Sequence, residues 1–138
     1  MNSNVDADIE AFLAGRVFAV AGASGDRHKY GNLVLRCYWQ RSRVAYPVNP
    51  RRSAIEGVAC YPTVRAVPEP VHGLSLVTQP ETSVQVVQEA LDCNVRHFWF
   101  QPGAEHPRAL ALARAADSVV IAGGPCVLVV LRYDASAD

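Results

Sequence analysis

The chain of 138 residues carries 13 basic and 13 acidic side chains, so its formal net charge is zero, and 50% of its residues are hydrophobic. This balance is typical of a soluble globular protein and gives no reason to expect a nucleic acid or a membrane as partner. No stretch approaches the roughly 18 uncharged apolar residues of a membrane span. The acidic N-terminus also lacks the basic-then-apolar pattern of a secretion signal, so we expect a cytoplasmic protein.

Strand-like and helix-like segments alternate along the chain. After a helical extension within residues 1–15, the continuous apolar run Val17–Ala21 predicts a strand that is covered on both faces. Apolar residues then recur at helical spacing from Tyr30 onward. The opposite, polar side of this predicted helix carries Asn32, Arg36 and Gln40.

The same patterns predict further elements downstream. The expected strands are Val44–Val48, Leu74–Val77, Phe98–Phe100 and Val119–Ala122, and the expected helices are Glu81–Asp92 and about Pro107–Ala116. The proline-rich connection "YPTVRAVPEP" leaves room for one helical turn. The last apolar run, Val127–Leu131, is a candidate for a sixth strand, which at a sheet edge could pair with a second chain in a homodimer.

Strands that alternate with helices imply right-handed crossovers and a parallel sheet. We therefore predict an α/β fold, a Rossmann-like, doubly wound and mainly parallel sheet of five to six strands with helices on both faces. The absence of a linker or an internal repeat favours one domain over residues 1–138.

Cysteine and histidine positions argue against disulfides and metal sites. The cysteines are Cys37, Cys60, Cys93 and Cys126, and the histidines are His28, His72, His97 and His106. The cysteines form no CxxC pair and the histidines are equally scattered, so reduced thiols are expected and metal binding has little support.

Small, polar and turn-forming residues follow every predicted strand. In open parallel sheets, ligands bind beyond the carboxyl ends of the strands, near the point where the strand order reverses. The segments at that edge are Gly22–Gly25, Asn49–Arg52, Thr78–Pro80, Gln101–Gly103 and Gly123–Pro125. They predict a ligand held there, although βα loops need turn residues in any case.

The first of these loops, in "VAGASGDRHKYG", follows the strand–glycine loop–helix plan of a phosphate site. Glycines let the backbone approach a phosphate closely, and the following helix offers free N–H groups. The loop is neither a Walker A sequence nor a full GxGxxG, and a plain tight turn is the alternative. If Gly22 leaves space for a phosphate, Gly22→Val should abolish binding while the sheet still forms.

The second loop discriminates among ligands. An NAD site usually has Asp or Glu at the end of the second strand, where this chain has Asn49 followed by Arg51 and Arg52. Guanidinium groups suit a ribose that carries an extra phosphate, as in NADP and coenzyme A. Arg27 and Lys29 could add charge near a diphosphate, or all four could be solvated surface charges.

Taken together, these segments resemble the CoA-binding domain family. The family includes small stand-alone proteins and the N-terminal domain of succinyl-CoA synthetase α-subunits and related NDP-forming acyl-CoA synthetases. The resemblance lies in "VAGASGDRHKYGNLVLR", "VAYPVNPRR", "GVACYPTVRAVPEPV" and "FWFQPGA", and it runs from about Arg16 to about Cys126. It implies a Rossmann-like fold with CoA lying across the strand ends.

The resemblance also implies which positions meet CoA. Gly22, Ala23 and Ser24 would face the diphosphate, and Asn49, Pro50 and Arg51 would lie near the adenosine phosphate. Thr78 and Pro80 would lie beside the nucleotide, and Gln101 and Gly103 would line the crevice. Further candidate ligand-binding residues are Gly25, Lys29, Tyr30, Gly31, Arg52 and Cys126.

One segment departs from the family pattern. Small members often have an Asp-Arg-Cys-Pro-like segment after the fifth strand, and this chain has "AGGPCVLVV". Cys126 matches the cysteine while the charged pair is absent. The thiol is either an ordinary buried cysteine or a neighbour of the CoA thiol, with which it could form a mixed disulfide under oxidation.

No set of residues in the sequence indicates which reaction, if any, the protein catalyses. The synthetases act, as the resemblance implies, through a phosphorylated histidine in a second domain and a separate nucleotide-grasp region, for which 138 residues leave no room. The leading hypothesis is a module that binds CoA or an acyl-CoA as carrier, sensor or accessory subunit of a synthetase-like partner. The alternatives are an NADP(H)-linked oxidoreductase or redox sensor, and a protein-interaction domain that has lost its ligand.

Overall fold

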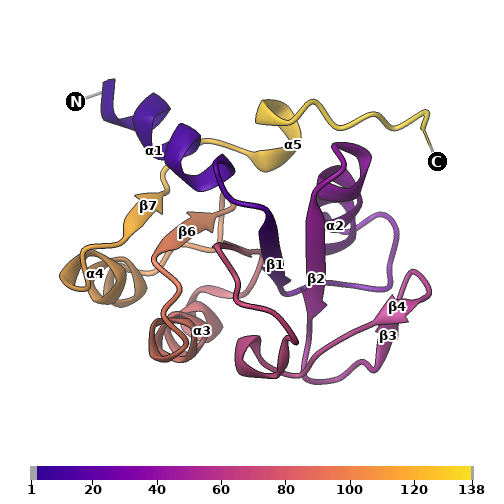
Figure 1. Cartoon of the computed structure of the whole chain (residues 1–138), viewed down its shortest axis with the longest axis horizontal. Helices are drawn as coiled ribbons and strands as arrows, with labels where there is room; N and C mark the ends of the chain where they lie inside the picture. The colour runs from indigo at the N-terminus through magenta and orange to yellow at the C-terminus, as the bar shows by residue number, and fades with distance from the viewer. Residues whose placement is uncertain (1–2, 138) are drawn as a thin grey trace.

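Five parallel strands form the central sheet of the computed structural model, which describes residues 3–137 (Figure 1). The strands are β1 (Val17–Ala21), β2 (Val44–Val48), β5 (Gly73–Leu76), β6 (His97–Phe100) and β7 (Val119–Ile121). Their spatial order is β2-β1-β5-β6-β7, and all neighbours are parallel. The chain therefore winds outward in both directions from β1, and the strand order reverses between β1 and β5.

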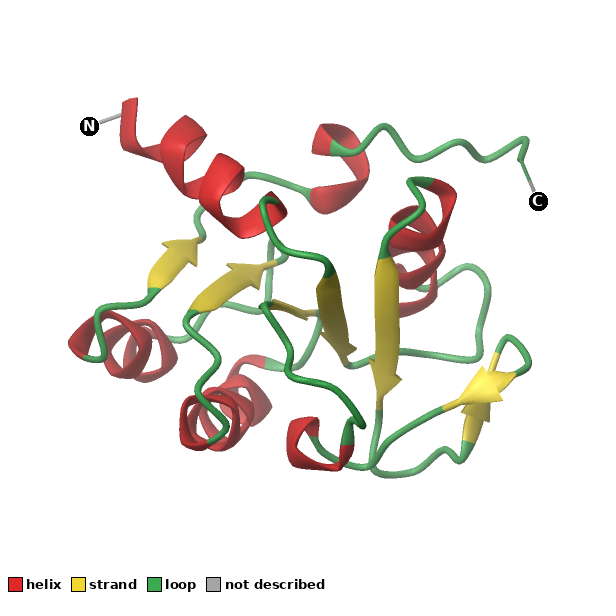
Figure 2. Ribbon diagram, viewed as in Figure 1, coloured by secondary structure: helices red, strands yellow, loops and turns green. Residues whose placement is uncertain are grey.

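Helices cover both faces of this sheet (Figure 2). They are α1 (Ser3–Leu13), α2 (Tyr30–Gln40), the 3-10 turn η1 (Val64–Ala66), α3 (Pro80–Asp92), α4 (Pro107–Ala115) and α5 (Val127–Val130). One core cluster packs η1, α3 and α4 against the sheet, and the other packs α1, α2 and α5 against the opposite face. The predicted α/β, doubly wound, Rossmann-like fold is confirmed, with five strands in its parallel sheet.

Alternation along the strands divides the core between the two faces. In β1, Phe18 and Val20 belong to the cluster beneath α1, α2 and α5, whereas Ala19 and Ala21 belong to the cluster beneath α3 and α4. Period-2 alternation of apolar residues on both faces is what a strand covered on both sides requires. The continuous apolar run of β1 is explained by this double burial.

Helix α1 lies over the sheet and is anchored by one aromatic side chain. The Phe12 ring lies 5.3 Å from the Phe18 ring and 5.3 Å, edge-on, from the Trp99 ring. These large buried rings contribute both apolar burial and favourable ring geometry. Residues 1 and 2 of the predicted N-terminal extension lie outside the described residues.

Two parts of the chain differ from the sequence expectation. The run Val127–Leu131 is not a sixth strand: it forms helix α5 after the turn at Gly123 and Gly124, so it offers no edge for pairing with a second chain. A short apolar run fits a strand or a buried helix equally well. The antiparallel hairpin of β3 (Ala54–Ile55) and β4 (Val58–Ala59) was not expected, although it turns through two residues at positive φ, as tight hairpins do.

Among residues 3–137, no helix combines the length and the apolar character needed to cross a bilayer.

Candidate functional site

The loops that follow the parallel strands meet at one edge of the sheet. In spatial order they come from β2, β1, β5, β6 and β7. Two hollows lie along this edge and share Tyr30, Val77 and Gln79 in their linings. The hollows therefore adjoin one another, as a site for one extended ligand would require.

The first hollow, here the glycine-loop groove, has a volume of about 610 Å³. It is lined by Gly22, Ala23, Ser24, His28, Lys29, Tyr30, Gly31, Asn49, Val77 and Gln79. The second, here the Gln101 pocket, has a volume of about 350 Å³. It is lined by Tyr30, Val77, Thr78, Gln79, Gln101, Pro102, Gly103, Ala104 and Cys126. Both volumes lie in the range of small-molecule sites.

Close packing of backbone against backbone shapes the glycine loop (residues 22–31). Gly22 has φ +83°, and a Cβ there would overlap the Val77 carbonyl oxygen. A Cβ on Gly31 would likewise overlap the Gly22 carbonyl oxygen. That Gly22 leaves space for a phosphate stays a prediction, whereas the overlap of an added Cβ with Val77 is a separate reason for glycine at this position. The missing side chain of Gly22 makes room for the chain that leaves β5.

The peptide groups of the loop turn their N–H bonds away from the protein. Asn49 Nδ2 donates to the Ala23 carbonyl at 2.8 Å, and Asn32 Nδ2 donates to the Ser24 carbonyl at 2.9 Å. Because C=O and N–H point in opposite directions across a trans peptide, the N–H groups of Ser24 and Gly25 face away from these partners. Within residues 3–137, neither N–H donates to an acceptor.

The start of helix α2 adds two more free donors. Among the described residues, the N–H groups of Tyr30 and Gly31 have no acceptor, as is usual in the first turn of a helix. Backbone N–H groups gathered at a helix N-terminus bind anions, and the helix dipole favours negative charge there. The loop and the helix start therefore offer four backbone donors to an anionic group.

Side chains of the loop are arranged by short-range hydrogen bonds. Ser24 Oγ accepts from the Asp26 N–H at 3.0 Å, and Asp26 Oδ1 accepts from the His28 N–H at 2.9 Å. Arg27 does not line the groove, because its guanidinium pairs with Glu56 of the β3–β4 hairpin. A hydrogen bond from Asn32 and the charge of Arg27 hold the pKa of the Glu56 carboxyl below its ordinary value.

The loop after β2 lies against the glycine loop. Asn49 Oδ1 accepts from the Arg51 N–H at 2.8 Å, so this side chain is committed to the two loops rather than to the solvent. The Arg52 guanidinium covers Gly25, where a Cβ would lie 2.8 Å from Arg52 Nη1. Arg51 and Arg52 are exposed. Two cations therefore stand at the β2 end of the edge.

Gln101 organises the opposite end of the edge. Its side chain is 3% exposed; Oε1 accepts from the Val127 N–H at 2.8 Å, and Nε2 contacts Cys126 Sγ at 3.3 Å. The Glu105 carboxylate joins the neighbouring loops, since it accepts from the N–H groups of Gly103 at 2.9 Å and Gly123 at 3.2 Å. No Asp, Glu, Lys, Arg or His side chain is among the described residues that line the Gln101 pocket.

Most of the residues predicted from the sequence line one of the two hollows. Those that line neither are Gly25, Pro50, Arg51, Arg52 and Pro80. Of these, Pro80 begins helix α3, and Gly25 lies beneath Arg52.

Sequence reasoning missed several residues of the site. Val77 lines both hollows; it was expected inside the strand Leu74–Val77, but β5 ends at Leu76. Gln79 also lines both hollows; it lies in the predicted edge segment Thr78–Pro80 but was not chosen as a ligand-binding residue. Asn32 and Arg36, expected on a polar face of α2, are buried. No pattern in the sequence indicated their burial, because polar residues usually mark the solvent side of a helix. Within residues 3–137, no group of three or more His, Cys, Asp or Glu side chains could hold a metal ion.

The chain is similar in sequence and in fold to known proteins. Over 81 residues, the chain is 33% identical to Acetate–CoA ligase [ADP-forming] I of Archaeoglobus fulgidus. The aligned region covers 59% of this chain and 12% of that relative. The chain thus spans only about an eighth of the length of that curated relative.

Solved structures with the same fold include short and long chains. A conserved hypothetical protein from Pyrococcus furiosus superposes with a TM-score of 0.77 and 35% identity, over 83% of this chain and 98% of that one. The dinucleotide forming acetyl-coenzyme A synthetase 1 of Ca. Korarchaeum cryptofilum shares the fold, with a TM-score of 0.70 and 23% identity, over 83% of this chain and 27% of the synthetase.

The family model described as "CoA binding domain" matches residues 16–132, which include every strand of the sheet and both hollows. The chain therefore belongs to the CoA-binding domain family.

Proposed function

We propose that the protein binds coenzyme A or an acyl-CoA along the carboxyl edge of its sheet, as a binding, carrier or sensor module. The observation that carries this proposal is a set of four N–H groups, at Ser24, Gly25, Tyr30 and Gly31, that have no acceptor in the part of the chain that the structure describes. Membership of the CoA-binding domain family supports CoA as the ligand that brings a diphosphate to them.

The order of the loops sets the direction of the ligand. CoA has a 3′-phosphate at its nucleotide end, a diphosphate in the middle and an uncharged pantetheine arm at the thiol end. Along the edge, the exposed cations Arg51 and Arg52 come first, the glycine-loop groove second and the uncharged Gln101 pocket last. The charged end of the protein edge would face the charged end of the ligand, and the uncharged pocket would face the uncharged arm. This complementarity favours one orientation.

In this orientation each part of the edge has a defined task. The Arg51 and Arg52 guanidinium groups bind the 3′-phosphate, and the four backbone donors bind the diphosphate. The pantetheine arm passes Thr78 and enters the Gln101 pocket, where the thiol or its acyl group lies near Cys126.

The test is a calorimetric titration of the ligand-stripped protein with CoA, dephospho-CoA, NADPH and NAD. We expect CoA to bind with micromolar affinity and to lose about tenfold, or about 1.4 kcal/mol, without its 3′-phosphate. The double variant Arg51→Ala/Arg52→Ala should bind CoA and dephospho-CoA equally. The matched control Arg65→Ala/Arg114→Ala also removes two exposed cations but away from the ligand edge, and it should keep the preference.

Two results would overturn the proposal. Preferential binding of NADPH would retain the fold and the phosphate loop but assign the protein to redox chemistry. Binding of none of the four ligands at millimolar concentration would leave the glycine loop as a turn and favour a protein-interaction role.

A further inference from the structure

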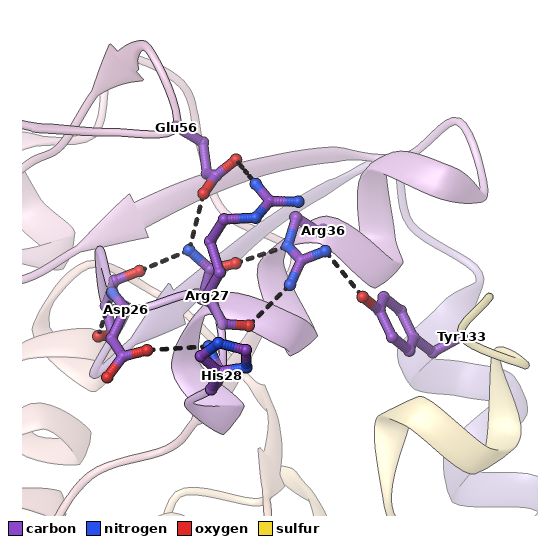
Figure 3. A network of polar contacts seen from close by, with 8 residues as sticks. Asp26, Arg27, His28, Arg36, Glu56 and Tyr133 are labelled. Atoms are coloured by element: carbon purple, nitrogen blue, oxygen red, sulfur yellow. Dashed lines mark hydrogen bonds and ion pairs between the residues drawn. The ribbon is translucent and has the colours of Figure 1, made fainter. Parts of the chain in front are cut away.

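A network of polar contacts links the glycine loop to helix α2, to the β3–β4 hairpin and to the C-terminal segment (Figure 3). At its centre are Asn32, which has no exposed surface, and Arg36, which is 7% exposed; both belong to helix α2. Burying an amide and a guanidinium costs free energy unless their polar atoms are paired. Their partners therefore show what this arrangement holds in place.

Arg36 joins three parts of the chain. Its Nε donates to Asn32 Oδ1 at 2.6 Å, its Nη1 to the Tyr133 hydroxyl at 2.8 Å, and its Nη2 to the Arg27 carbonyl at 2.9 Å. A guanidinium stays protonated and has a planar, fixed set of donors, so these three acceptors are held in fixed relative positions. One of them, the Arg27 carbonyl, belongs to the glycine loop.

Asn32 holds a second carbonyl of the same loop. Its Oδ1 accepts from Arg36, which orients the amide so that Nδ2 donates to the Ser24 carbonyl at 2.9 Å and to Glu56 Oε2 at 3.0 Å. The other oxygen of Glu56 pairs with Arg27. The network thus ties the glycine loop to helix α2 and to the β3–β4 hairpin.

We propose that Asn32 and Arg36 are positioning residues for the phosphate site. By holding the Ser24 and Arg27 carbonyls on the protein side, they keep the loop in the shape that presents its free N–H groups to an anion. Affinity for the diphosphate then depends on two side chains that never touch it. This inference rests on the proposed binding of CoA.

The physical basis is preorganisation. A peptide group that can rotate must be ordered when the ligand binds, and that cost is subtracted from the affinity. In metal sites, removal of the side chains that orient the ligating groups commonly lowers affinity by about ten- to hundredfold, and the same physical reasoning applies to oriented peptide groups. We expect a loss of about tenfold for Arg36→Gln or Asn32→Ala.

The chain offers a matched control on the same helix. Arg41, at the C-terminal end of α2, donates through Nε to the Leu131 carbonyl at 2.6 Å and through Nη2 to the Arg132 carbonyl. It therefore docks the same C-terminal segment that carries Tyr133, but it does not contact the glycine loop. Arg41→Gln separates loosening of the C-terminal segment from loss of loop positioning.

The experiment measures the affinity of wild type, Arg36→Gln, Asn32→Ala and Arg41→Gln for CoA and for dephospho-CoA, with the binding stoichiometry from the same titrations. In the first two variants, both affinities should fall by about tenfold with one site retained. The ratio of the two affinities, which depends on Arg51 and Arg52, should stay at the wild-type value. Arg41→Gln should bind as wild type does.

A general loss of structure would instead lower the stoichiometry or the ratio, and either result would overturn the positioning role. Wild-type affinity in folded Arg36→Gln would also overturn it, while leaving the proposed function intact. If Arg36→Gln does not fold, Asn32→Ala decides by the same criteria. A wild-type protein that binds neither ligand contradicts the proposed function and, with it, this inference.

Discussion

Replacing Gly22 with alanine tests whether the glycine loop is shaped by contact with the backbone after β5. Gly22 has φ +83°, so any side chain there adopts the left-handed region, which costs about 1–2 kcal/mol. The new Cβ would also lie 2.7 Å from the Val77 carbonyl carbon. Forcing an extra carbon into a packed site costs about 1–3 kcal/mol more.

Gly57, in the β3–β4 hairpin, is the matched control. Its φ is +78°, nearly that of Gly22, and a Cβ there would meet nothing within 4 Å. Gly57→Ala therefore carries the left-handed cost alone. For a chain of this length, 1 kcal/mol corresponds to about 3–4 °C in Tm, so we expect a decrease of about 3–8 °C for Gly57→Ala and about 6–20 °C for Gly22→Ala.

Thermal unfolding followed by circular dichroism measures both changes. Gly22→Ala should also weaken CoA binding, because relief of the overlap moves the loop away from β5, whereas Gly57→Ala should bind as wild type does. Equal decreases in Tm for the two variants would refute the reasoning, since the contact between Gly22 and Val77 would then contribute nothing.

Three further predictions concern the thiols, the acyl group and pH. Bound CoA should slow alkylation of Cys126, which lines the Gln101 pocket, and should leave alkylation of the distant Cys93 unchanged. Cys37 should resist alkylation with or without CoA, because burial raises the pKa of its thiol to about 11. Mass spectrometry of the alkylated peptides measures all three rates. Malonyl-CoA and succinyl-CoA should bind more weakly than acetyl-CoA in calorimetry, because a carboxylate would lose its water in a pocket that provides no cation; equal affinities would place the acyl group elsewhere. Burial, with the stacked His72 ring 4.0 Å away, holds the pKa of His97 below its ordinary 6.5. The unfolded chain therefore binds the extra proton first as pH falls, so Tm should decrease below about pH 6.5, and His97→Gln should flatten that slope.

The sequence was sufficient to predict the order of the main strands and helices because each has its own periodicity. The apolar run Val17–Ala21, followed by glycines and then helical spacing from Tyr30, appears in the structure as β1, the glycine loop and α2. Parallel topology then brings the loops to one edge, so the neighbourhood of the candidate site also followed from the sequence.

Other features depend on tertiary contacts that one sequence does not display. Asn32 and Arg36 occupy polar positions in the helical pattern, yet they are buried because each bonds a loop carbonyl and a side chain from a distant segment. Val127–Leu131 reads as a strand, but the Gln101 side chain holds the N–H of Val127 at the start of a helix. Gly22 lines the glycine-loop groove, but the sequence did not show that a Cβ at this position would overlap the backbone of Val77.

Binding of the CoA diphosphate by four backbone donors is the step on which the proposed function depends. Amide chemical shifts of the ¹⁵N-labelled protein, recorded during titration with CoA, test it most directly. The N–H signals of Ser24, Gly25, Tyr30 and Gly31 should shift most, and dephospho-CoA should reproduce those shifts while changing the signals of Arg51 and Arg52 less. Saturable binding of CoA that leaves these four signals in place, and shifts others instead, would contradict the account.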